Sequence, residues 1–331
     1  MSLSTILLAG GEGSRLGLDI PKALLPFSPI KKKTLIQYKL ELCKAQDADA
    51  LIGIVVSKKG QQAIGAHLKA NGYFGLEEGR VQFLIQKEVP YLLDGEQFFS
   101  EEGVIASAPN GNGGIFEAEG FDSFLSAAPD EITITSIDNP LINPFDSRFY
   151  EHPEAECIIG VCESIGGDKV GTVSADGDIF DYTESEGVYE HANLGAYRFS
   201  KKVLEDIRSK QPLEFHDIVK VTKKYDPTSG EIVQIEAMKQ EKFITDVPRF
   251  CRGKKLAHFD RKTSFAPIKS QEDVERVQKQ VLAQDKDLLL RAGLTVSGDV
   301  ELHPACRFHA PEELFARFSP KQPLSGYYEL D

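Results

Sequence analysis

The chain has 331 residues and a mass of 36.6 kDa, which is enough for one large α/β domain with an appendage or for two domains. Hydrophobic residues make up 41% and charged residues 27%, as is ordinary for a globular protein. The net charge of -13 argues against broad binding to nucleic acids or to membrane surfaces, so an enzyme of this composition must gather its basic groups where it binds phosphate.

The cysteines and the first residues bear on the compartment. None of the five cysteines stands in a Cys-x-x-Cys pair, and the chain does not open with the charged, apolar and cleavage regions of a signal peptide. We therefore expect free thiols in a cytoplasmic protein. No apolar run approaches the ~20 residues that a membrane-spanning helix needs, so we expect no membrane partner.

The first expected element is a buried strand over residues 5–8, which are apolar and partly β-branched. It runs directly into the stretch Gly10-Gly11-Glu12-Gly13-Ser14-Arg15-Leu16-Gly17, and Pro21-Lys22 follows. Four glycines in eight residues let the backbone approach a ligand, so that its N–H groups can bind anionic oxygens. Arg15 and Lys22 add positive charge. The stretch indicates a phosphate-binding loop, with a plain glycine-rich turn as the alternative.

Two common phosphate-binding motifs do not fit this loop. A dinucleotide-binding fingerprint would need a glycine in place of Leu16. A P-loop would need Gly-Lys-Ser/Thr at its end, whereas Gly17 is followed by Leu18 and Asp19. The loop therefore belongs to a different class.

Strands and helices then alternate, with helices expected over residues 34–43 and 61–70 and strands over residues 51–57 and 81–86. Thr34 is the expected N-cap of the first helix, and the basic run Lys31-Lys32-Lys33 before it is typical of a solvated loop. The alternation predicts a parallel sheet, in which ligands bind at the carboxyl ends of the strands. Gln86 emerges at such an end, and its amide offers both a donor and an acceptor to the edge of a base.

A second glycine-rich stretch covers residues 107–116, with two asparagines and three glycines between Asn110 and Gly114. Such residues tolerate positive φ, so a loop is expected there, either as a binding element or as a plain connection. A β run over residues 132–137 follows and ends in Asp138-Asn139. A carboxylate at the carboxyl end of a buried strand suits Mg²⁺, which usually takes one or two carboxylates plus substrate phosphates. An Asx turn that closes the strand is the alternative.

The second half of the chain changes character. Strands are expected over residues 157–163 and 171–174, with a hairpin turn at Asp176-Gly177 into residues 179–184. A capping box at Ser270-x-x-Asp273 opens a helix that Gly293 ends, and short strand-like pieces with prolines follow. We place a catalytic domain at residues 1–292 and a small β-rich C-terminal lobe at residues 293–331.

Taken together, these motifs resemble those of the UDP-sugar pyrophosphorylases. The loop at 10–17 with Pro21-Lys22 is similar to the family signature Gly-Gly-x-Gly-Ser/Thr-Arg-Leu-Gly followed by Pro-Lys. Residues 109–114 resemble its Pro-Asp-Gly-Asn-Gly-Gly segment with Asn110 in place of Asp, and residues 137–139 resemble its Val-Asp-Asn motif with Ile137 in place of Val. The resemblance extends from Thr5 to Lys269 and is closest to the UDP-N-acetylhexosamine type.

The later motifs match less completely. Residues 192–197 keep Asn193 of the family's Gly-Asn-Ile-Ala-Asn-His, but Ala196 and Tyr197 replace the second Asn and the His. Residues 214–220 resemble its Tyr-His-x-x-x-Lys-Lys element through His216, and residues 241–246 resemble a strand that carries an acidic residue, here Asp246. Residues 265–269 match Phe-Ser/Ala-Pro-x-Lys, whose lysine contacts phosphate.

The resemblance implies an α/β fold with a doubly wound, mostly parallel mixed sheet of the Rossmann-like nucleotidyltransferase kind. It implies catalytic phosphate contacts from Arg15, Lys22 and Lys269, and sugar contacts from Asn139, Glu184, Asn193 and His216. It implies Mg²⁺ or Mn²⁺ ligands at Asp138 and Asp246. The nucleotide contacts that it implies are Leu8, Ala9, Gly10, Gly11, Gly13, Gln86, Pro109, Asn110, Asn112, Gly113 and Asp138.

The expected reaction is attack by a sugar 1-phosphate oxygen on the α-phosphorus of UTP, with loss of pyrophosphate and no covalent enzyme intermediate. Charge neutralisation by lysine, arginine and Mg²⁺ would supply most of the catalysis. The expected sugar substrate is N-acetylglucosamine 1-phosphate, with glucose 1-phosphate as the alternative. A nucleotide-sugar glycosyltransferase normally carries Asp-x-Asp where this chain has Asp138-Asn139-Pro140, and a non-catalytic nucleotide-sugar-binding protein would need only base and ribose contacts.

Overall fold

The computed structural model describes residues 3–13, 16–17, 19–101, 103–165, 170–180, 191–308, 310–318 and 323–329. Its centre is a nine-stranded mixed sheet. Strands β3, β2, β1 and β10 lie side by side and are parallel, and β14 is antiparallel to β10. On its other edge β14 pairs with antiparallel β11, which pairs in turn with parallel β17. These strands are β1 (Ser4–Leu8), β2 (Leu51–Val56), β3 (Val81–Ile85), β10 (Glu131–Ser136), β11 (Cys157–Glu163), β14 (His191–Ser200) and β17 (Lys254–His258).

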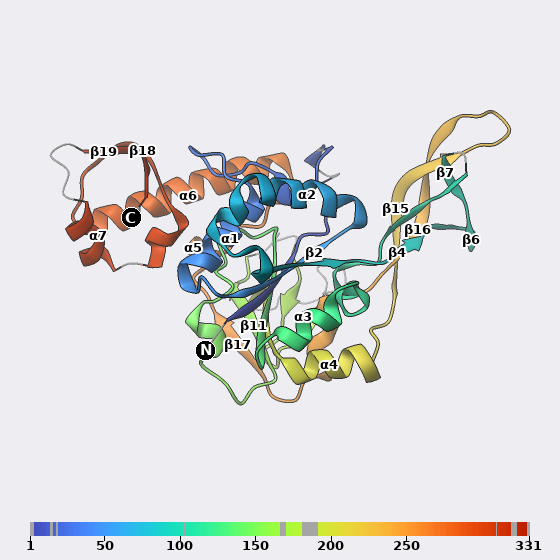
Figure 1. Cartoon of the computed structure of the whole chain (residues 1–331), viewed down its shortest axis with the longest axis horizontal. Coiled ribbons are helices and arrows are strands. Elements are labelled where there is room, and N and C mark those ends of the chain that lie inside the picture. Colours follow the sequence, from blue (N-terminus) through green and yellow to red (C-terminus); the bar gives the residue numbers. More distant parts are fainter. Residues whose placement is uncertain are drawn as a thin grey trace.

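Helices cover both faces of this sheet, as Figure 1 shows. In β1 the side chain of Leu7 packs with α1, α2 and α6, whereas Ile6 and Leu8 pack on the opposite face with α3 and α4. A strand buried on both faces is apolar throughout rather than alternating, which is why residues 5–8 predicted a buried strand correctly. The helices are α1 (Leu35–Gln46), α2 (Lys58–Ala70), α3 (Phe121–Ala127), α4 (Lys201–Lys210), the short α5 (Arg261–Ser264) and α6 (Gln271–Arg291).

The strand order reverses between β1 and β10. From β1 the chain moves outward to β2 and β3, and β10 then returns to the other side of β1. In open α/β sheets, ligands bind outside the carboxyl ends of the strands at such a reversal. We call the carboxyl ends of β1 and β10 the switch-point edge. The hairpin of β12 (Thr172–Val173) and β13 (Ile179–Phe180) pairs with β14 just beyond the end of β10, so it borders this edge.

A long hairpin projects from the body at the right of Figure 1 and was not foreseen from the sequence. It consists of β15 (His216–Tyr225) and β16 (Ile232–Glu241), and β5 (Leu92–Leu93) and β6 (Glu96–Gln97) extend its sheet. Two further small pairs lie between β3 and α3 in the sequence: β4 (Glu88–Pro90) with β9 (Ser107–Pro109), and β7 (Phe99–Glu101) with β8 (Val104–Ile105). The projection has a small core of its own around Phe98, Ala106 and Ala237.

The C-terminal lobe forms around the end of α6, at the left of Figure 1. It contains the parallel strands β18 (Val296–Leu302) and β19 (Leu324–Tyr328), the 3₁₀ helix η8 (Pro304–Phe308) and α7 (Pro311–Arg317). Its core includes Leu289 of α6 and Ala292, the residue that follows this helix, so α6 is shared between the lobe and the larger domain. Helical segments thus accompany the strands expected from the sequence.

The basic run at residues 31–33 contacts this lobe. The carboxylate of Glu301, fully buried in β18, accepts hydrogen bonds from the backbone N–H groups of Ile30 and Lys31. The ammonium groups of Lys31 and Lys33 lie 4.6 Å and 5.1 Å from the ring centre of Tyr327. The run is therefore a docking point for the lobe rather than only a solvated loop.

Several local predictions are confirmed. The Thr34 side chain accepts from the N–H of Gln37 at the start of α1, and Ser270 and Asp273 form a capping box at the start of α6. Gly293, just past α6, has φ of 77°, which is the left-handed conformation that ends helices. All five cysteines are free thiols. In the part of the chain that the structure describes, no helix is both long and apolar enough to span a membrane.

The strand expected over residues 241–246 is wrong. Strand β16 ends at Glu241, and the 3₁₀ helix η7 (Ile244–Phe250) follows and carries Asp246. The backbone groups that would continue a strand are used elsewhere, because Lys242 O accepts from Gly113 N–H and Ile244 N–H donates to Asn112 Oδ1. A long-range contact therefore overrides the local β pattern.

Candidate active site

The first glycine-rich loop folds back so that Lys22 meets Asp138. After β1, the N–H of Ala9 still donates to Val55 O of β2 at 3.0 Å, and the N–H of Lys22 donates to Gly11 O at 3.1 Å. Lys22 is 8% exposed, and its Nζ lies 2.7 Å from Asp138 Oδ1. Two residues that follow adjacent parallel strands are thereby joined across the switch-point edge. Gly11 is exposed and Gly13 half-buried, so this loop remains accessible beside the ion pair.

The segment that carries Lys269 runs along the end of β10. The N–H of Ile268 donates to Asp138 O at 2.9 Å, and Asn139 Nδ2 donates to Ser264 O at 2.9 Å. The N–H of Lys269 donates to Asp273 Oδ2 at 2.8 Å, which places this residue at the start of α6. The backbones of Asp138 and Lys269 are therefore brought to the same edge, as the sequence motifs require. The sugar contact expected of Asn139 stays a prediction.

Gln86 joins the two glycine-rich loops. It follows β3 directly, and its N–H donates to Val56 O at the end of β2 at 2.9 Å. Its Nε2 donates to Gly111 O, and its Oε1 lies so close to Gly10 that a Cβ atom there would overlap it. Among the described residues, Oε1 has no hydrogen-bond partner. Gly10 therefore leaves room for the Gln86 amide in this position, and the base contact expected of Gln86 stays a prediction.

The second glycine-rich loop is closed against the segment after β16. The N–H of Gly113 donates to Lys242 O and the N–H of Lys242 donates to Asn110 O, each at 2.8 Å. The Oδ1 of Asn112 accepts from the N–H of Ile244 at 2.9 Å. Asn110 is fully buried, and its Oδ1 has no partner in the described part of the chain. The amide oxygen of Asn112 thus acts inside the protein, while its expected nucleotide contact and those of Pro109, Asn110 and Gly113 remain predictions.

On the sugar side, Asn193 is bonded to a neighbour in its own strand. Its Nδ2 donates to Tyr197 Oη at 2.8 Å, and its Oδ1 accepts from the N–H of Gly195 at 2.9 Å. Gly195 has φ of 65° at an irregularity in the pairing with β11, which brings residues four apart in a strand within reach of each other. Burial raises the pKa of the Tyr197 hydroxyl. The amide of Asn193 is therefore already oriented by the protein itself.

His216 and Asp246 are brought together, but as partners of each other. Asp246 is 5% exposed, its Oδ2 lies 2.7 Å from His216 Nε2, and its Oδ1 pairs with the guanidinium of Arg249. The ring of His216 also packs against Phe243, with ring centres 4.8 Å apart. Both carboxylate oxygens of Asp246 are thus held by basic side chains.

The two expected metal ligands differ in how they fit Mg²⁺. The side chain of Asp138 is 36% exposed and lies beside the first glycine-rich loop, which suits an ion that takes few carboxylates plus substrate phosphates. Asp246 offers no oxygen without a basic partner. Within the described ranges, no three His, Cys, Asp or Glu side chains gather in a way that could hold a metal ion. Asp138 therefore fits a shared metal–phosphate site better than Asp246 does.

Two expected site residues, Arg15 and Glu184, lie outside the described residues. Leu8 is the last residue of β1 and Pro109 the last of β9, so both stand where the loops begin. Three partners were missed from the sequence, namely Tyr197, Lys242 and Arg249. Tyr197 had been noted only as a departure from the family pattern, and the other two owe their roles to contacts that no local pattern reveals.

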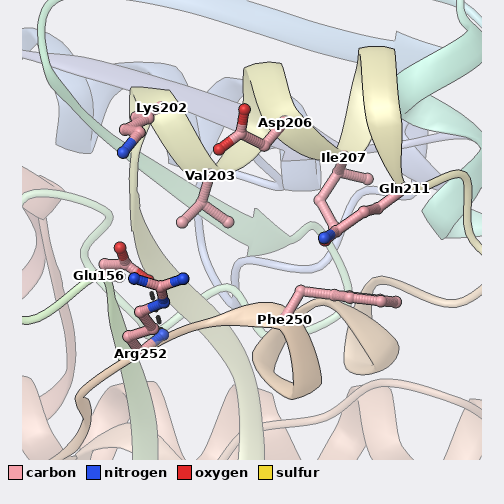
Figure 2. A pocket seen from close by; sticks show the side chains of 8 residues that line it. All are labelled: Glu156, Lys202, Val203, Asp206, Ile207, Gln211, Phe250 and Arg252. Atoms are coloured by element: carbon pink, nitrogen blue, oxygen red, sulfur yellow. Dashed lines mark hydrogen bonds between the residues drawn. The ribbon is translucent and has the colours of Figure 1, made fainter.

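A pocket of about 140 Å³ lies away from this edge. It sits where α4 faces the end of η7, as Figure 2 shows, and is lined by Glu156, Lys202, Val203, Asp206, Ile207, Gln211, Phe250 and Arg252. Glu156 O accepts from the N–H of Ser200, the β14 residue that pairs with Glu131 at the amino end of β10. The pocket is therefore at the opposite edge of the sheet from Asp138 and is not the candidate active site.

A glycine loop after the first strand, a carboxylate after the adjacent strand and a lysine that joins them are features of a Rossmann-like nucleotide-binding fold. Solved structures agree with this fold. One from Entamoeba histolytica, assigned as a UDP-N-acetylglucosamine pyrophosphorylase, superposes with a TM-score of 0.81 at 19% identity and covers 99% of this chain and 92% of its own. The UDP-N-acetylglucosamine pyrophosphorylase of Trypanosoma brucei gives a TM-score of 0.74 at 20% identity, over 100% of this chain and 79% of its own.

Curated relatives carry the same names. A Schizosaccharomyces pombe protein assigned as a UDP-N-acetylglucosamine pyrophosphorylase is 27% identical over 94% of this chain and 75% of its own length. A Dictyostelium discoideum protein of the same assignment is 26% identical over 81% and 64%, and the human UDP-N-acetylhexosamine pyrophosphorylase-like protein 1 is 25% identical over 88% and 66%. No model of a known protein family matches the chain.

The chain is thus similar in sequence and in fold to UDP-sugar pyrophosphorylases. It spans 64% to 75% of the length of these three relatives.

Proposed function

We propose that this protein is a uridylyltransferase that forms UDP-N-acetylglucosamine and pyrophosphate from UTP and N-acetylglucosamine 1-phosphate. The observation that carries the proposal is the 2.7 Å pair of Lys22 and Asp138 at the point where the strand order reverses. A protein that only recognised the base and ribose would have no need of a nearly buried lysine beside a carboxylate and a phosphate-binding loop.

Each group has a role in this reaction. The N–H groups of the first glycine-rich loop, with Arg15, would hold the β- and γ-phosphates of UTP, and Lys22 would neutralise charge on the phosphate oxygens that react. Lys269 would hold the phosphate of the sugar substrate from the start of α6. When bound, Mg²⁺ would be held by Asp138 and the substrate phosphates and would offset their negative charge.

The base and the sugar are selected at the two ends of the same edge. Gln86 and the second glycine-rich loop would frame uracil, because a purine is larger and a site that bonds one base edge leaves polar groups unpaired with another. Asn139, Asn193 and His216 would line the sugar side together with Glu184. We place the protein in the cytoplasm, in line with its free thiols.

Exchange of radiolabelled pyrophosphate into UTP, in the presence of UDP-N-acetylglucosamine and Mg²⁺, tests the proposal. Only a pyrophosphorylase catalyses this exchange, so a glycosyltransferase or a non-catalytic binding protein would give none. The label should enter UTP well ahead of ATP when the corresponding ADP-sugar is offered. Absence of exchange with any UDP-sugar would refute the proposed activity.

A further inference from the structure

Lys39 is an ionisable residue at a buried position of a helix, where a purely structural role would favour an apolar side chain. It lies in α1 and is fully buried, and its helix neighbours Leu35, Ile36 and Cys43 belong to the apolar cluster between α1 and the sheet. Its Nζ donates to the backbone carbonyl of Ile142, 103 residues away. A buried ammonium group whose acceptor is a neutral carbonyl is less favourable than a methionine of similar volume in the same space.

The carbonyl that Lys39 binds belongs to the segment that carries Asp138. Ahead of this segment, the N–H of Ile137 donates to Leu8 O at 3.2 Å, and behind it the N–H of Phe145 donates to Asn143 Oδ1 at 3.0 Å. Residues 139–142 themselves take part in no backbone–backbone hydrogen bond with any described residue. Their hydrogen-bonded anchors are two side-chain contacts, from Asn139 Nδ2 to Ser264 O and from Lys39 Nζ to Ile142 O.

We propose that Lys39 is a positioning residue that fixes the 138–142 segment through the Ile142 carbonyl, so that the Asp138 carboxylate stays against Lys22 and ready for a metal–nucleotide complex. The inference rests on the proposed function. A displacement of about 1 Å in a catalytic segment can lower the rate by about 10²-fold, so the loss of one of the two side-chain anchors of this stretch can matter to catalysis without mattering to folding.

Lys33 provides the matched control. It is also a buried lysine, 5% exposed and close to α1, but its Nζ pairs with the Glu41 carboxylate at 2.6 Å and faces the C-terminal lobe. Replacing Lys33 by methionine removes one partner of the largely buried Glu41 carboxylate. Because a buried charge that loses its partner is costly, this substitution destabilises the protein. Replacing Lys39 by methionine removes the donor of the neutral Ile142 carbonyl and leaves no carboxylate unpaired. The two substitutions should therefore act on different properties.

The experiment compares Lys39→Met, Lys39→Gln and Lys33→Met with the unaltered protein. We expect Lys39→Met to lower kcat for pyrophosphate exchange between tenfold and 10²-fold, with an unchanged or raised melting temperature. Lys39→Gln keeps a donor and should recover part of the rate. Lys33→Met should lower the melting temperature and leave kcat near its original value. Full activity in Lys39→Met, or a loss of its melting temperature that parallels Lys33→Met, would overturn the inference.

A binding measurement separates this inference from the proposed function. Mn²⁺ titrations in the presence of UTP, followed by electron paramagnetic resonance, report the position of Asp138 without any turnover. We expect about tenfold weaker Mn²⁺ binding in Lys39→Met and unchanged binding in Lys33→Met. If the unaltered protein exchanged no pyrophosphate, the proposed activity would fall and this titration would still test Lys39. Equal Mn²⁺ affinity in Lys39→Met and the unaltered protein would overturn the inference.

Discussion

The two glycine-rich loops have similar compositions and opposite uses of their backbones. In the first loop, Gly11 is exposed and a Cβ atom there would meet only the Lys22 side chain at 4.0 Å. In the second, Gly113 and Gly114 are buried, and the N–H of Gly113 is already bonded to Lys242 O. In the first loop Gly11 stays open to solvent, whereas in the second loop Gly113 lets two backbone segments of the protein pack together. Glycine content alone does not distinguish these uses.

The largest expected effect tests the first glycine-rich loop. We predict that Lys22→Ala lowers kcat by about 10² or more with little change in stability, because it removes charge neutralisation that matters most in the transition state. Steady-state pyrophosphate exchange and thermal melting check both halves of the statement. A variant with near-normal kcat would show that the pair with Asp138 is a structural ion pair and would remove the main support for the assigned site.

The next effect tests the second glycine-rich loop. At Gly113 a Cβ atom would lie 2.6 Å from the carbonyl carbon and 2.7 Å from the nitrogen of Phe243, which are backbone atoms that cannot turn aside. We therefore predict that Gly113→Ala lowers the free energy of unfolding by about 2 kcal/mol. Gly11→Ala is the matched control, expected to change it by no more than about 0.5 kcal/mol. Urea unfolding of the two variants decides the matter, and equal losses would contradict the distinction between the loops.

Much of the switch-point edge could be predicted from the sequence, and the reasons are local. The run at residues 5–8 is apolar because both faces of β1 are covered, and Asp138 follows a similar buried run. The ends of these strands and the loops after them could therefore be predicted from the sequence. The resemblance supplied the expected roles of Lys22, Gln86 and Lys269, which stay predictions. The structure then showed that Lys22 and Asp138 are in contact and that Gln86 ties the two loops together.

What could not be predicted depends on partners distant in the sequence. The hairpin of β15 and β16 leaves Val219 and Val221 about two-thirds exposed at 66% and 64%, so its apolar residues do not mark a core face. The 3₁₀ helix that carries Asp246 replaces an expected strand because the N–H of Ile244 donates a hydrogen bond to Asn112, which lies 132 residues away in the sequence. The role of Lys39 likewise depends on a carbonyl 103 residues away.

A third test uses the pH dependence of stability that the buried Lys39 should cause. Burial lowers the pKa of Lys39 to about 7, and the nearby Cys43 acts in the opposite direction. In the unfolded chain this lysine keeps its ordinary value near 10.5, so between these pH values the unfolded state binds more protons. The stability should therefore rise with pH across this window, by at most about 1.4 kcal/mol per pH unit from this group.

The Lys39→Met variant isolates this term. Its free energy of unfolding should lack the rise between pH 7 and 10, while below pH 7 its difference from the unaltered protein should be constant. The other titratable group that acts on Lys39 is Cys43, whose thiol has a pKa raised by burial to about 12 and so stays protonated throughout. Denaturant unfolding at several pH values measures the difference, and parallel pH profiles of the two proteins would contradict the buried, low-pKa state of Lys39.

The smallest expected effect concerns the sugar, because the asparagine expected to contact it, like the second glycine-rich loop, is already hydrogen-bonded within the protein. The side-chain amide of Asn193 bonds to Tyr197 and Gly195, so it offers fewer free hydrogen-bonding groups to a substrate than an unpaired asparagine would. A small group accepted or refused by such a pocket is worth only ~1–3 kcal/mol. We therefore predict a partial preference, with N-acetylglucosamine 1-phosphate ahead of glucose 1-phosphate by about tenfold in kcat/KM, or about 1.4 kcal/mol.

A panel of sugar 1-phosphates at fixed UTP and Mg²⁺ measures this preference. Tyr197→Phe is the companion variant, because it frees the amide of Asn193 and should therefore change the ratio of the two sugars while the exchange reaction itself stays intact. Glucose 1-phosphate ahead by tenfold would reverse the choice of sugar and leave the class of reaction standing.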